Sequence, residues 1–248
     1  MRQQYGTTPV GPGEYRDKTT GLVRPKDAAT LIIVRAGAQP TLLMGKRAAS
    51  HRFMPNKFVF PGGGLEVIDQ RLQVEGELSQ PVMCRLRKAI QKGVTDRKLR
   101  GLALAAIRET YEETGLVVGR PAEQSFNTRH RVWKQYLAQG AEPPLEHMDF
   151  IARAITPPYR TKRFDTRFFL IHDQFIFNDP EHITHVSGEL NQLHWLTLAQ
   201  ARDLDLPAVT RWAIDIVEKR IELAPSEQLK QSAPFVRFAG KQAISMML

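Results

Sequence analysis

The sequence predicts one domain of the α/β or α+β class. With 248 residues the chain allows one large domain or two small ones. Its 42% hydrophobic and 25% charged residues are an ordinary globular composition. Between residues 28 and 223, strand-like and helix-like stretches intermingle without the regular alternation that is typical of a doubly wound sheet.

Composition also excludes several classes of protein. The single cysteine, Cys84, excludes an internal disulfide framework and a site built from several cysteines. No apolar run approaches the roughly 20 residues that cross a membrane. The first twenty residues contain no apolar stretch like that of a signal peptide. We therefore expect a cytoplasmic protein.

The expected elements begin after an N-terminal arm, residues 1–24, in which prolines and glycines interrupt regular structure. Apolar, β-rich runs then predict three strands, at residues 30–34, 41–44 and 58–60. The first two are separated by a Gly-Ala-Gln-Pro sequence, which indicates a hairpin. The third ends at Pro61 and the three glycines that follow it.

Residues 70–100 form a polar, basic segment. Between Arg85 and Arg100 there are seven Lys or Arg residues and one acid, Asp96. This stretch therefore contributes 7 − 1 = 6 units to the formal net charge of +9. Three apolar residues have helical spacing and predict one amphipathic helix here: Val82, Leu86 and Ile90.

A second helix is expected from about residue 98 to Gly115, whose missing Cβ suits a left-handed helix end. Beyond it, the expected helices are 122–137, 198–204 and 207–223. The expected strands are 150–155, 167–171 and 190–196. The tail, residues 224–248, has one β-like piece at 235–238.

The strongest chemical signal is the end of the second helix. Glu109, Glu112 and Glu113 fall at positions i, i+3 and i+4, so three carboxylates share one face. They repel one another and lie in the last turn, where the helix dipole disfavours negative charge. A divalent cation such as Mg²⁺ or Mn²⁺ would remove the conflict. A solvated acidic face is the alternative.

A glycine-rich turn lies upstream of these carboxylates. Phe58-Val59-Phe60 runs into Pro61 and Gly62-Gly63-Gly64. Glycines let backbone amides or carbonyls approach a metal ion or a phosphate closely. A tight turn with no ligand explains the same residues, so this signal is weak by itself.

Taken together, the two motifs resemble the signature of the Nudix hydrolases, G-x5-E-x7-R-E-U-x-E-E-x-G-U with U a bulky aliphatic residue. Its right half is matched at Arg108, Glu109, Glu112, Glu113, Gly115 and Leu116, with Thr110 at the first aliphatic position. Gly63 is taken as the first glycine, which places Asp69 at the glutamate position. Arg108 follows Gly63 by 45 positions (108 − 63) against 14 in the signature, so the basic segment is identified as an insertion of 31 residues.

The resemblance implies a Nudix-type α/β/α sandwich with a mixed sheet, a single domain over residues 25–223 with a helical insertion. It also implies metal-dependent cleavage of a diphosphate linked to another moiety, with Mg²⁺ or Mn²⁺. Glu112 and Glu113 would be the principal metal ligands, and Glu109 a further ligand or the base. A backbone carbonyl of the glycine loop, at Gly62 or Gly63, would join them.

Two further residues are assigned to the reaction. Arg108 belongs to the matched signature and is counted with the catalytic residues. The base varies in position among Nudix hydrolases, and Glu189, just before the last expected strand, is a candidate for it. An ordinary loop acid is the alternative for Glu189.

The insertion and the sequence around Arg163 to Phe169 are similar to the coenzyme A diphosphatase branch of the family. Coenzyme A or acyl-CoA is therefore the leading substrate, with Arg47, Arg163 and Arg167 as substrate-binding residues. An upstream coenzyme A signature is only half present, since Leu43 and Arg47 fit it but Met54 and Asn56 do not. Arg167 has an alternative as the cross-strand partner of an acid.

Other functions stay open. Within the family the alternatives are ADP-ribose, NADH and dinucleoside polyphosphates. A non-catalytic Nudix sensor or an RNA-binding protein is a further alternative. The basic insertion has no Phe, Tyr or Trp on which bases could stack, which disfavours nucleic acid. We expect a small-molecule nucleoside diphosphate derivative as the partner and no membrane. The insertion could also cover the core or form a homodimer contact.

Overall fold

The computed structural model describes residues 21, 23–49, 55–124, 126–181 and 189–248. The expected N-terminal arm lies almost wholly outside these residues, as does Met54. The described helices include none that is long and apolar enough to cross a membrane.

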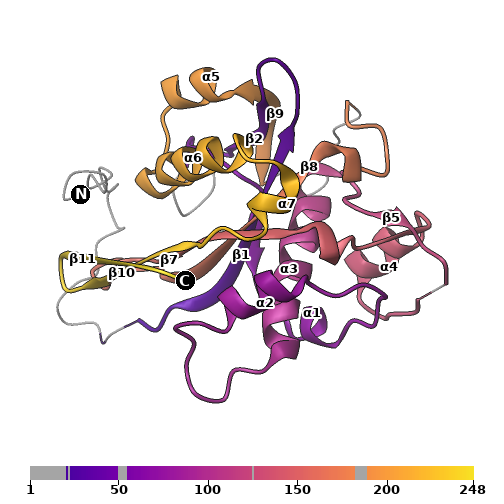
Figure 1. Ribbon diagram of the computed structural model, residues 1–248, viewed down its shortest axis with the longest axis horizontal. Helices are drawn as coiled ribbons and strands as arrows, with labels where there is room; N and C mark the ends of the chain where they lie inside the picture. Colours follow the sequence, from indigo (N-terminus) through magenta and orange to yellow (C-terminus); the bar gives the residue numbers. More distant parts are fainter. Residues whose placement is uncertain (1–20, 22, 50–54, 125, 182–188) are drawn as a thin grey trace.

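Nine strands of the described chain form one mixed sheet (Figure 1). Their bounds are β1 (Lys26–Arg35), β2 (Thr41–Arg47), β3 (Phe58–Val59), β4 (Gly62–Gly64), β7 (Asp149–Ile155), β8 (Phe164–His172), β9 (Leu190–Thr197), β10 (Pro234–Ala239) and β11 (Gln242–Met247). The order is β11-β10-β7-β8-β1-β2-β3, while β4 also pairs with β1 and β9 with β2. The β1–β8 and β10–β7 pairs are parallel, and the others are antiparallel.

Helices cover both faces of this sheet. They are α1 (Val67–Arg71), α2 (Gln80–Leu86), α3 (Asp96–Thr114), α4 (Arg131–Leu137), α5 (Leu198–Asp203), α6 (Ala208–Ile221) and α7 (Pro225–Gln228). Alternate residues of β1 point to opposite cores, because side chains in a strand alternate between its faces. Leu31 and Ile33 pack with α2, α3 and α4, whereas Ile32 and Val34 pack with α5 and α6. The result is a three-layer α/β/α domain.

The basic segment packs on the first of these cores. Its buried apolar residues are Leu72, Leu78, Val82, Met83 and Leu86. Arg85 is also buried and bonds the carboxylate of Asp149 on β7. The expected amphipathic helix is present as α2, and the segment covers the sheet beside α3.

Most sequence-predicted elements are present, including the first hairpin, but one expected helix is wrong in its first half. Residues 122–137 were expected to be helical, yet α4 begins at Arg131. The chain before α4 starts at a small two-stranded sheet, in which β5 (Arg120–Pro121) pairs with β6 (Ala141–Glu142). Next to this sheet, the Ala122 amide donates a hydrogen bond to the Gly140 carbonyl. Backbone pairing across the α4 connection thus replaces the first helical turns.

The C-terminal tail is also more ordered than expected. Beyond the single β-like piece, which is β10, the chain adds α7 and the edge strand β11. β10 pairs with β7 through Phe235 and Val236, so the tail extends the central sheet.

Candidate active site at the end of helix α3

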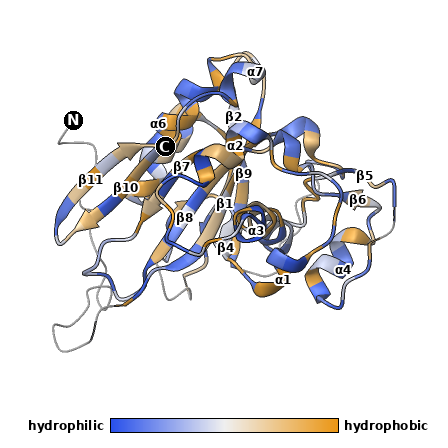
Figure 2. Cartoon of the chain, turned by 60° about the horizontal axis from the view of Figure 1, so that its bottom comes forward, coloured by the Kyte–Doolittle hydropathy of each residue, from blue (hydrophilic) through white to orange (hydrophobic). Residues whose placement is uncertain are grey.

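Helix α3 holds the three glutamates rigidly. The Thr95 hydroxyl accepts a hydrogen bond from the Lys98 amide at 3.3 Å and caps the first turn. Gly115 ends the helix with φ 74°, in the left-handed region predicted for it. Residues 101–107 between these ends are all buried. Figure 2 views α3 nearly along its axis, beside β1 and β4.

The three glycines of β4 bring the backbone against these carboxylates. β4 pairs antiparallel with residues 28–30 of β1. A side chain at Gly63 would collide with the carboxyl group of Glu109 and force that carboxylate to move, so glycine allows this approach with Glu109 in place. The Gly62 amide donates a hydrogen bond to Glu113 Oε2 at 3.0 Å. The glycine-rich turn and the carboxylate face, 45 positions apart at Gly63 and Arg108, therefore meet.

Arg108 lies beneath the carboxylates, and its side chain is only 1% exposed. Its Nη1 is 3.0 Å from Glu109 Oε1 and 3.4 Å from Glu112 Oε2. Its Nη2 donates to the Gly64 carbonyl at 2.8 Å. One guanidinium thus fixes the glycine strand and two of the three glutamates.

Asp69 secures the other edge of this guanidinium. Arg108 Nε donates to Asp69 Oδ1 at 2.9 Å, and Nη2 donates to Oδ2 at 3.1 Å. The indole Nε1 of Trp133 also donates to Oδ1, at 2.9 Å, and the Glu66 amide donates to Oδ2 at 2.9 Å. Asp69 is fully buried, and its carboxylate accepts four hydrogen bonds.

The carboxylates carry more negative charge than their surroundings neutralise. Burial, followed by the charge of Glu112, raises the pKa of Glu109 to about 7, although Arg108 opposes the shift. Burial raises the pKa of Glu113 to about 8, and the charges of Glu109 and Glu189 add to the effect. The Gly62 amide and the charge of Arg47 lower the pKa of Glu113 without cancelling the rise. A bound cation would relieve this excess charge.

Arg47 and Glu189 both lie close enough to act electrostatically on Glu113. Arg47 ends β2 opposite Leu190 of β9, and the Ala48 amide donates to the Glu189 carbonyl at 3.1 Å. Two residues selected from distant parts of the sequence therefore come to the same carboxylate.

Arg167 lies in a different environment from the one predicted for it. Its side chain is 4% exposed, and Nη1 bonds Asp27 Oδ1 at 2.7 Å and lies 3.2 Å from Asp165 Oδ1. Asp27 is on the neighbouring strand β1, so Arg167 is the cross-strand partner of an acid. A guanidinium that is buried and paired in this way is not available to a substrate, which corrects its assignment as a substrate-binding residue.

Arg163 bonds backbone carbonyls in this structure. Its Nε donates to the Thr156 carbonyl at 3.0 Å, and its Nη1 donates to the Val23 carbonyl at 2.8 Å. These bonds tie the β7–β8 loop to the segment before β1. Arg163 therefore has a structural role whether or not it also meets a substrate.

Helix α4 borders the carboxylates, which no sequence pattern predicted. His130 Nε2 lies 3.3 Å from Glu66 Oε2, and Arg131 Nη2 lies 3.9 Å from Glu112 Oε1. Trp133 lies in the helix expected over residues 122–137, and no role at the site was predicted for it. A buried tryptophan usually needs an acceptor for its indole N–H, so Trp133 could have indicated a buried polar partner near this helix.

The donor set suits a hard divalent cation, although the side chains are not yet arranged around one. In the described chain, no group of three or more His, Cys, Asp or Glu residues is arranged as a metal site. The carboxylate of Glu112 pairs with Arg108 and lies 3.9 Å from Arg131. Oxygen ligands from Glu109, Glu112, Glu113 and the glycine backbone are nevertheless the type that Mg²⁺ and Mn²⁺ prefer.

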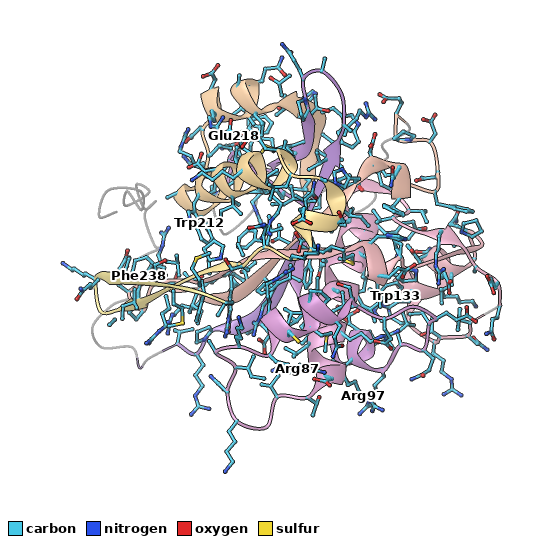
Figure 3. All side chains as sticks on the ribbon, viewed as in Figure 1. Arg87, Arg97, Trp133, Trp212, Glu218 and Phe238 are labelled. Atoms are coloured by element: carbon cyan, nitrogen blue, oxygen red, sulfur yellow. The ribbon has the colours of Figure 1, made fainter. Side chains whose placement is uncertain are left out.

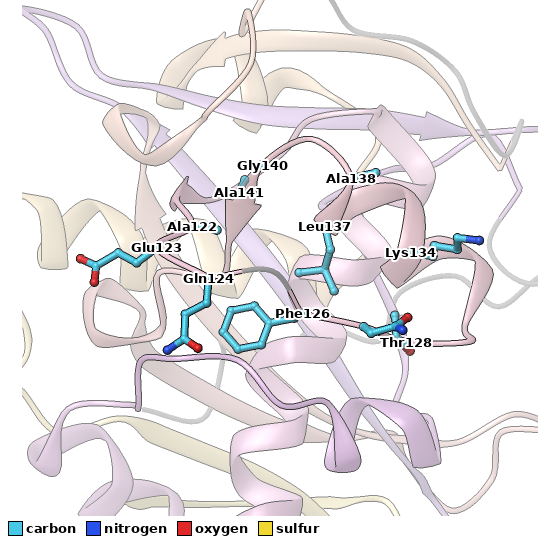
Figure 4. Close-up of a pocket in the computed structure, with 11 residues that line it drawn as sticks. Ala122, Glu123, Gln124, Phe126, Thr128, Lys134, Leu137, Ala138, Gly140 and Ala141 are labelled. Atoms are coloured by element: carbon cyan, nitrogen blue, oxygen red, sulfur yellow. The ribbon is translucent and has the colours of Figure 1, made fainter.

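A hollow of about 490 Å³ lies between α4 and the chain segment before it (Figure 4). Phe126 and Leu137 supply its apolar wall, and Glu123 and Lys134 carry its charges. None of the three glutamates lines it. It is therefore separate from the candidate active site.

No protein-family model and no curated protein matches the chain. Among solved structures, a Nudix hydrolase from Alicyclobacillus acidocaldarius is 24% identical with a TM-score of 0.60, over 85% of this chain and 98% of that chain. A MutT Nudix hydrolase from Burkholderia pseudomallei is 16% identical with a TM-score of 0.45, over 79% and 99%. The Nudix domain of NrtR from Shewanella oneidensis, complexed with ADP-ribose, is 9% identical with a TM-score of 0.46, over 80% and 90%. The Alicyclobacillus structure shows that this chain has the mixed α/β fold of the Nudix hydrolases.

Proposed function

We propose that this protein is a divalent-metal-dependent hydrolase that cleaves the diphosphate bond of a nucleoside diphosphate linked to another moiety. The observation that carries the proposal is the end of α3, where three glutamates lie against a glycine strand with insufficient positive charge around them. The Nudix fold supports the same activity. The resemblance in sequence to the Nudix signature also implies metal ligands at these residues.

Glu112, Glu113 and the Gly63 carbonyl would hold the metal, and Glu109 would be a further ligand or the base. Mg²⁺ or Mn²⁺ bound there would neutralise the diphosphate charge and polarise the attacked phosphorus. Glu112 would exchange its contacts with Arg108 and Arg131 for this role. Arg108 itself is too deeply buried to meet a substrate, so we assign it the task of orienting Glu109 and Glu112.

Hydrolysis requires a base that takes a proton from the attacking water. The water oxygen bonds to phosphorus while the bridging P–O bond breaks, and the departing phosphate keeps the bridging oxygen. Glu109 suits the role of base, because burial raises its pKa to about 7, near the pH at which it would work. Glu189 is the second candidate, since it lies within electrostatic reach of Glu113. Arg47 reaches the same region and could balance the charge of a bound phosphate.

Coenzyme A or acyl-CoA remains the leading substrate, on the resemblance of the insertion and of residues 163–169. Such a substrate carries an additional ribose phosphate, and the pairing of Arg167 removes one of the three arginines proposed to bind the substrate, which leaves Arg47 and Arg163. ADP-ribose, NADH and dinucleoside polyphosphates need no such additional phosphate site. They are therefore the direct competitors.

A hydrolysis panel tests both the proposed activity and the proposed substrate. Purified protein would be incubated with Mg²⁺ or Mn²⁺ and with coenzyme A, acyl-CoA, ADP-ribose, NADH, diadenosine polyphosphates and capped RNA. We expect metal-dependent release of two phosphorylated products from coenzyme A or acyl-CoA. Turnover of another small molecule alone would change the substrate and keep the activity. Binding without turnover of any member would support the sensor, and a salt-dependent shift of RNA would support the RNA-binding alternative.

A further inference from the structure

Trp133 connects α4 to the carboxylate site through a chain of hydrogen bonds. Its indole Nε1 donates to Asp69 Oδ1, and Asp69 in turn binds two nitrogens of Arg108. Arg108 faces Glu109 and Glu112 with its remaining nitrogen. The indole is fully buried and packs edge-to-face on Tyr136 at 5.2 Å, so its orientation is fixed by the core.

The indole N–H of Trp133 fills one of the acceptor positions of the Asp69 carboxylate. An ionised carboxylate has about four acceptor positions, and the four bonds to Asp69 fill them. Two come from Arg108, one from the Glu66 amide and one from Trp133. Removing the indole N–H would leave a buried anionic oxygen with one partner fewer, and Asp69 could tilt toward its other donors. Arg108 would then turn with it.

We propose that Trp133 is a positioning residue that sets the orientation of Arg108, and through it the two glutamates, for metal binding. The inference rests on the proposed function. It also explains why α4 lies where it does, because the same anchor holds Arg131 and His130 beside Glu112 and Glu66. Groups that orient metal ligands from behind typically change metal affinity by about 10- to 100-fold when they are removed.

The matched comparison uses the two buried tryptophans Trp133 and Trp212, which lie in different parts of the molecule (Figure 3). Trp212 packs on Phe168 in the core between the sheet and α6, away from the glutamates. Trp133→Phe and Trp212→Phe each remove one indole from a core, but only the first removes a donor to Asp69. A purely structural role for Trp133 predicts the same effect on metal binding from both.

The experiment is a titration of the full-length protein with Mn²⁺, followed by the electron paramagnetic resonance signal of the free ion. We expect Trp133→Phe to raise the Mn²⁺ dissociation constant about tenfold and Trp212→Phe to change it less than about twofold. In an Asp69→Asn background, Trp133→Phe should add little, because residues that act through one another are not additive.

Each contrary result has a distinct meaning. An unchanged dissociation constant in Trp133→Phe, or a full additive effect on top of Asp69→Asn, overturns the inference and leaves the proposed function standing. A wild-type protein that binds no Mn²⁺ overturns both. If Trp133→Phe does not fold, benzothienylalanine at position 133 keeps the shape of the ring, removes the donor and gives the same readout.

Discussion

The cations of the basic segment and the carboxylates at the end of α3 are both clusters of like charge, and the fold treats them differently. In the basic segment Arg85 pairs with Asp149, Arg87 with Asp96, and Lys98 with Asp27. At the other end of α3, Glu109 and Glu112 share Arg108, which is already bonded to Asp69, and Glu113 accepts a hydrogen bond from the neutral Gly62 amide. Charges that are neutralised one by one stabilise a fold, whereas charges left in excess and buried favour a ligand of opposite sign.

The largest expected effect tests the carboxylates. Glu113→Gln keeps the size of the side chain and an acceptor for the Gly62 amide, but removes the charge. We expect metal-dependent hydrolysis to fall by about 10³-fold, within the range for loss of one catalytic group. The fold should survive, because a buried charge is replaced by a neutral amide. Initial rates and a thermal melt of the same preparation measure the two effects.

The control for this variant is Glu227→Gln, which changes an exposed acid on α7 that pairs with Lys230. Its activity should equal that of the wild type. If Glu113→Gln retained full metal-dependent activity, the ligand assignment would be wrong, and the excess charge at the end of α3 would need another explanation.

Replacing a paired cation of the basic segment should have the opposite effects, a loss of stability with little change in activity. Arg85→Met leaves the buried carboxylate of Asp149 with Arg220, whose Nε is 3.4 Å from Asp149 Oδ2. We expect the free energy of unfolding to fall by about 3 kcal/mol, since removing one partner of a buried ion pair leaves a poorly compensated charge. The kcat of the folded protein should stay within about twofold of the wild type. Urea unfolding measures the first quantity and initial rates the second.

The exposed Arg87–Asp96 pair is the matched control for Arg85. Arg87→Met should leave the free energy of unfolding nearly unchanged, as exposed ion pairs contribute little. A loss of activity in Arg85→Met with unchanged unfolding would contradict the separation of structural cations from the active site.

The stability of the metal-free protein should fall as pH rises. Glu109 and Glu113 have folded-state pKa values of about 7 and about 8, against 4.5 for the ordinary group. Between pH 4.5 and 8 the folded state therefore binds more protons than the unfolded state, and deprotonation favours unfolding. We expect the melting temperature in EDTA to drop by about 5 °C from pH 5 to pH 8.5, a size typical of roughly 2 kcal/mol in a chain of this length.

Mg²⁺ should reverse this trend, because it binds the deprotonated carboxylates and stabilises the folded state. The increase in melting temperature with Mg²⁺ should be larger at pH 8.5 than at pH 5. Glu113→Gln, which has one titrating group fewer, should show a flatter pH dependence in EDTA. A metal-free melting temperature that rises over this pH range, in both proteins alike, would show that the carboxylates carry no excess charge.

The sequence was sufficient for features that depend on neighbouring residues. The extent of α3, its end at Gly115 and the shared face of its three glutamates follow from helical spacing and from the freedom of glycine. The approach of Gly63 to Glu109 does not follow from such local patterns, because the two residues are far apart in sequence. It was expected through the resemblance to the Nudix signature.

Features that depend on which buried groups meet could not be predicted. The helix expected over residues 122–137 begins only at Arg131, and the chain before it starts with the β5–β6 pairing and the bond from the Ala122 amide to the Gly140 carbonyl. A strand pattern does not show whether Arg167 reaches solvent or pairs with a partly exposed aspartate on the next strand. The bond from Trp133 to Asp69 joins positions 64 apart, and neither residue's spacing indicates the other.

The smallest expected effect concerns the exposed cations of the basic segment. Lys88, Lys92 and Arg97 are exposed, and the last of them precedes Glu109 by twelve positions on α3. At 1.5 Å per residue this is about 18 Å along the helix, beyond the screening length of about 8 Å at physiological ionic strength. We therefore expect the triple variant Lys88→Gln, Lys92→Gln, Arg97→Gln to change KM by less than about twofold in the substrate panel. A KM that rose tenfold, and did so less at high salt, would make these cations part of the phosphate-binding surface, and the contrast between the two charge clusters would disappear.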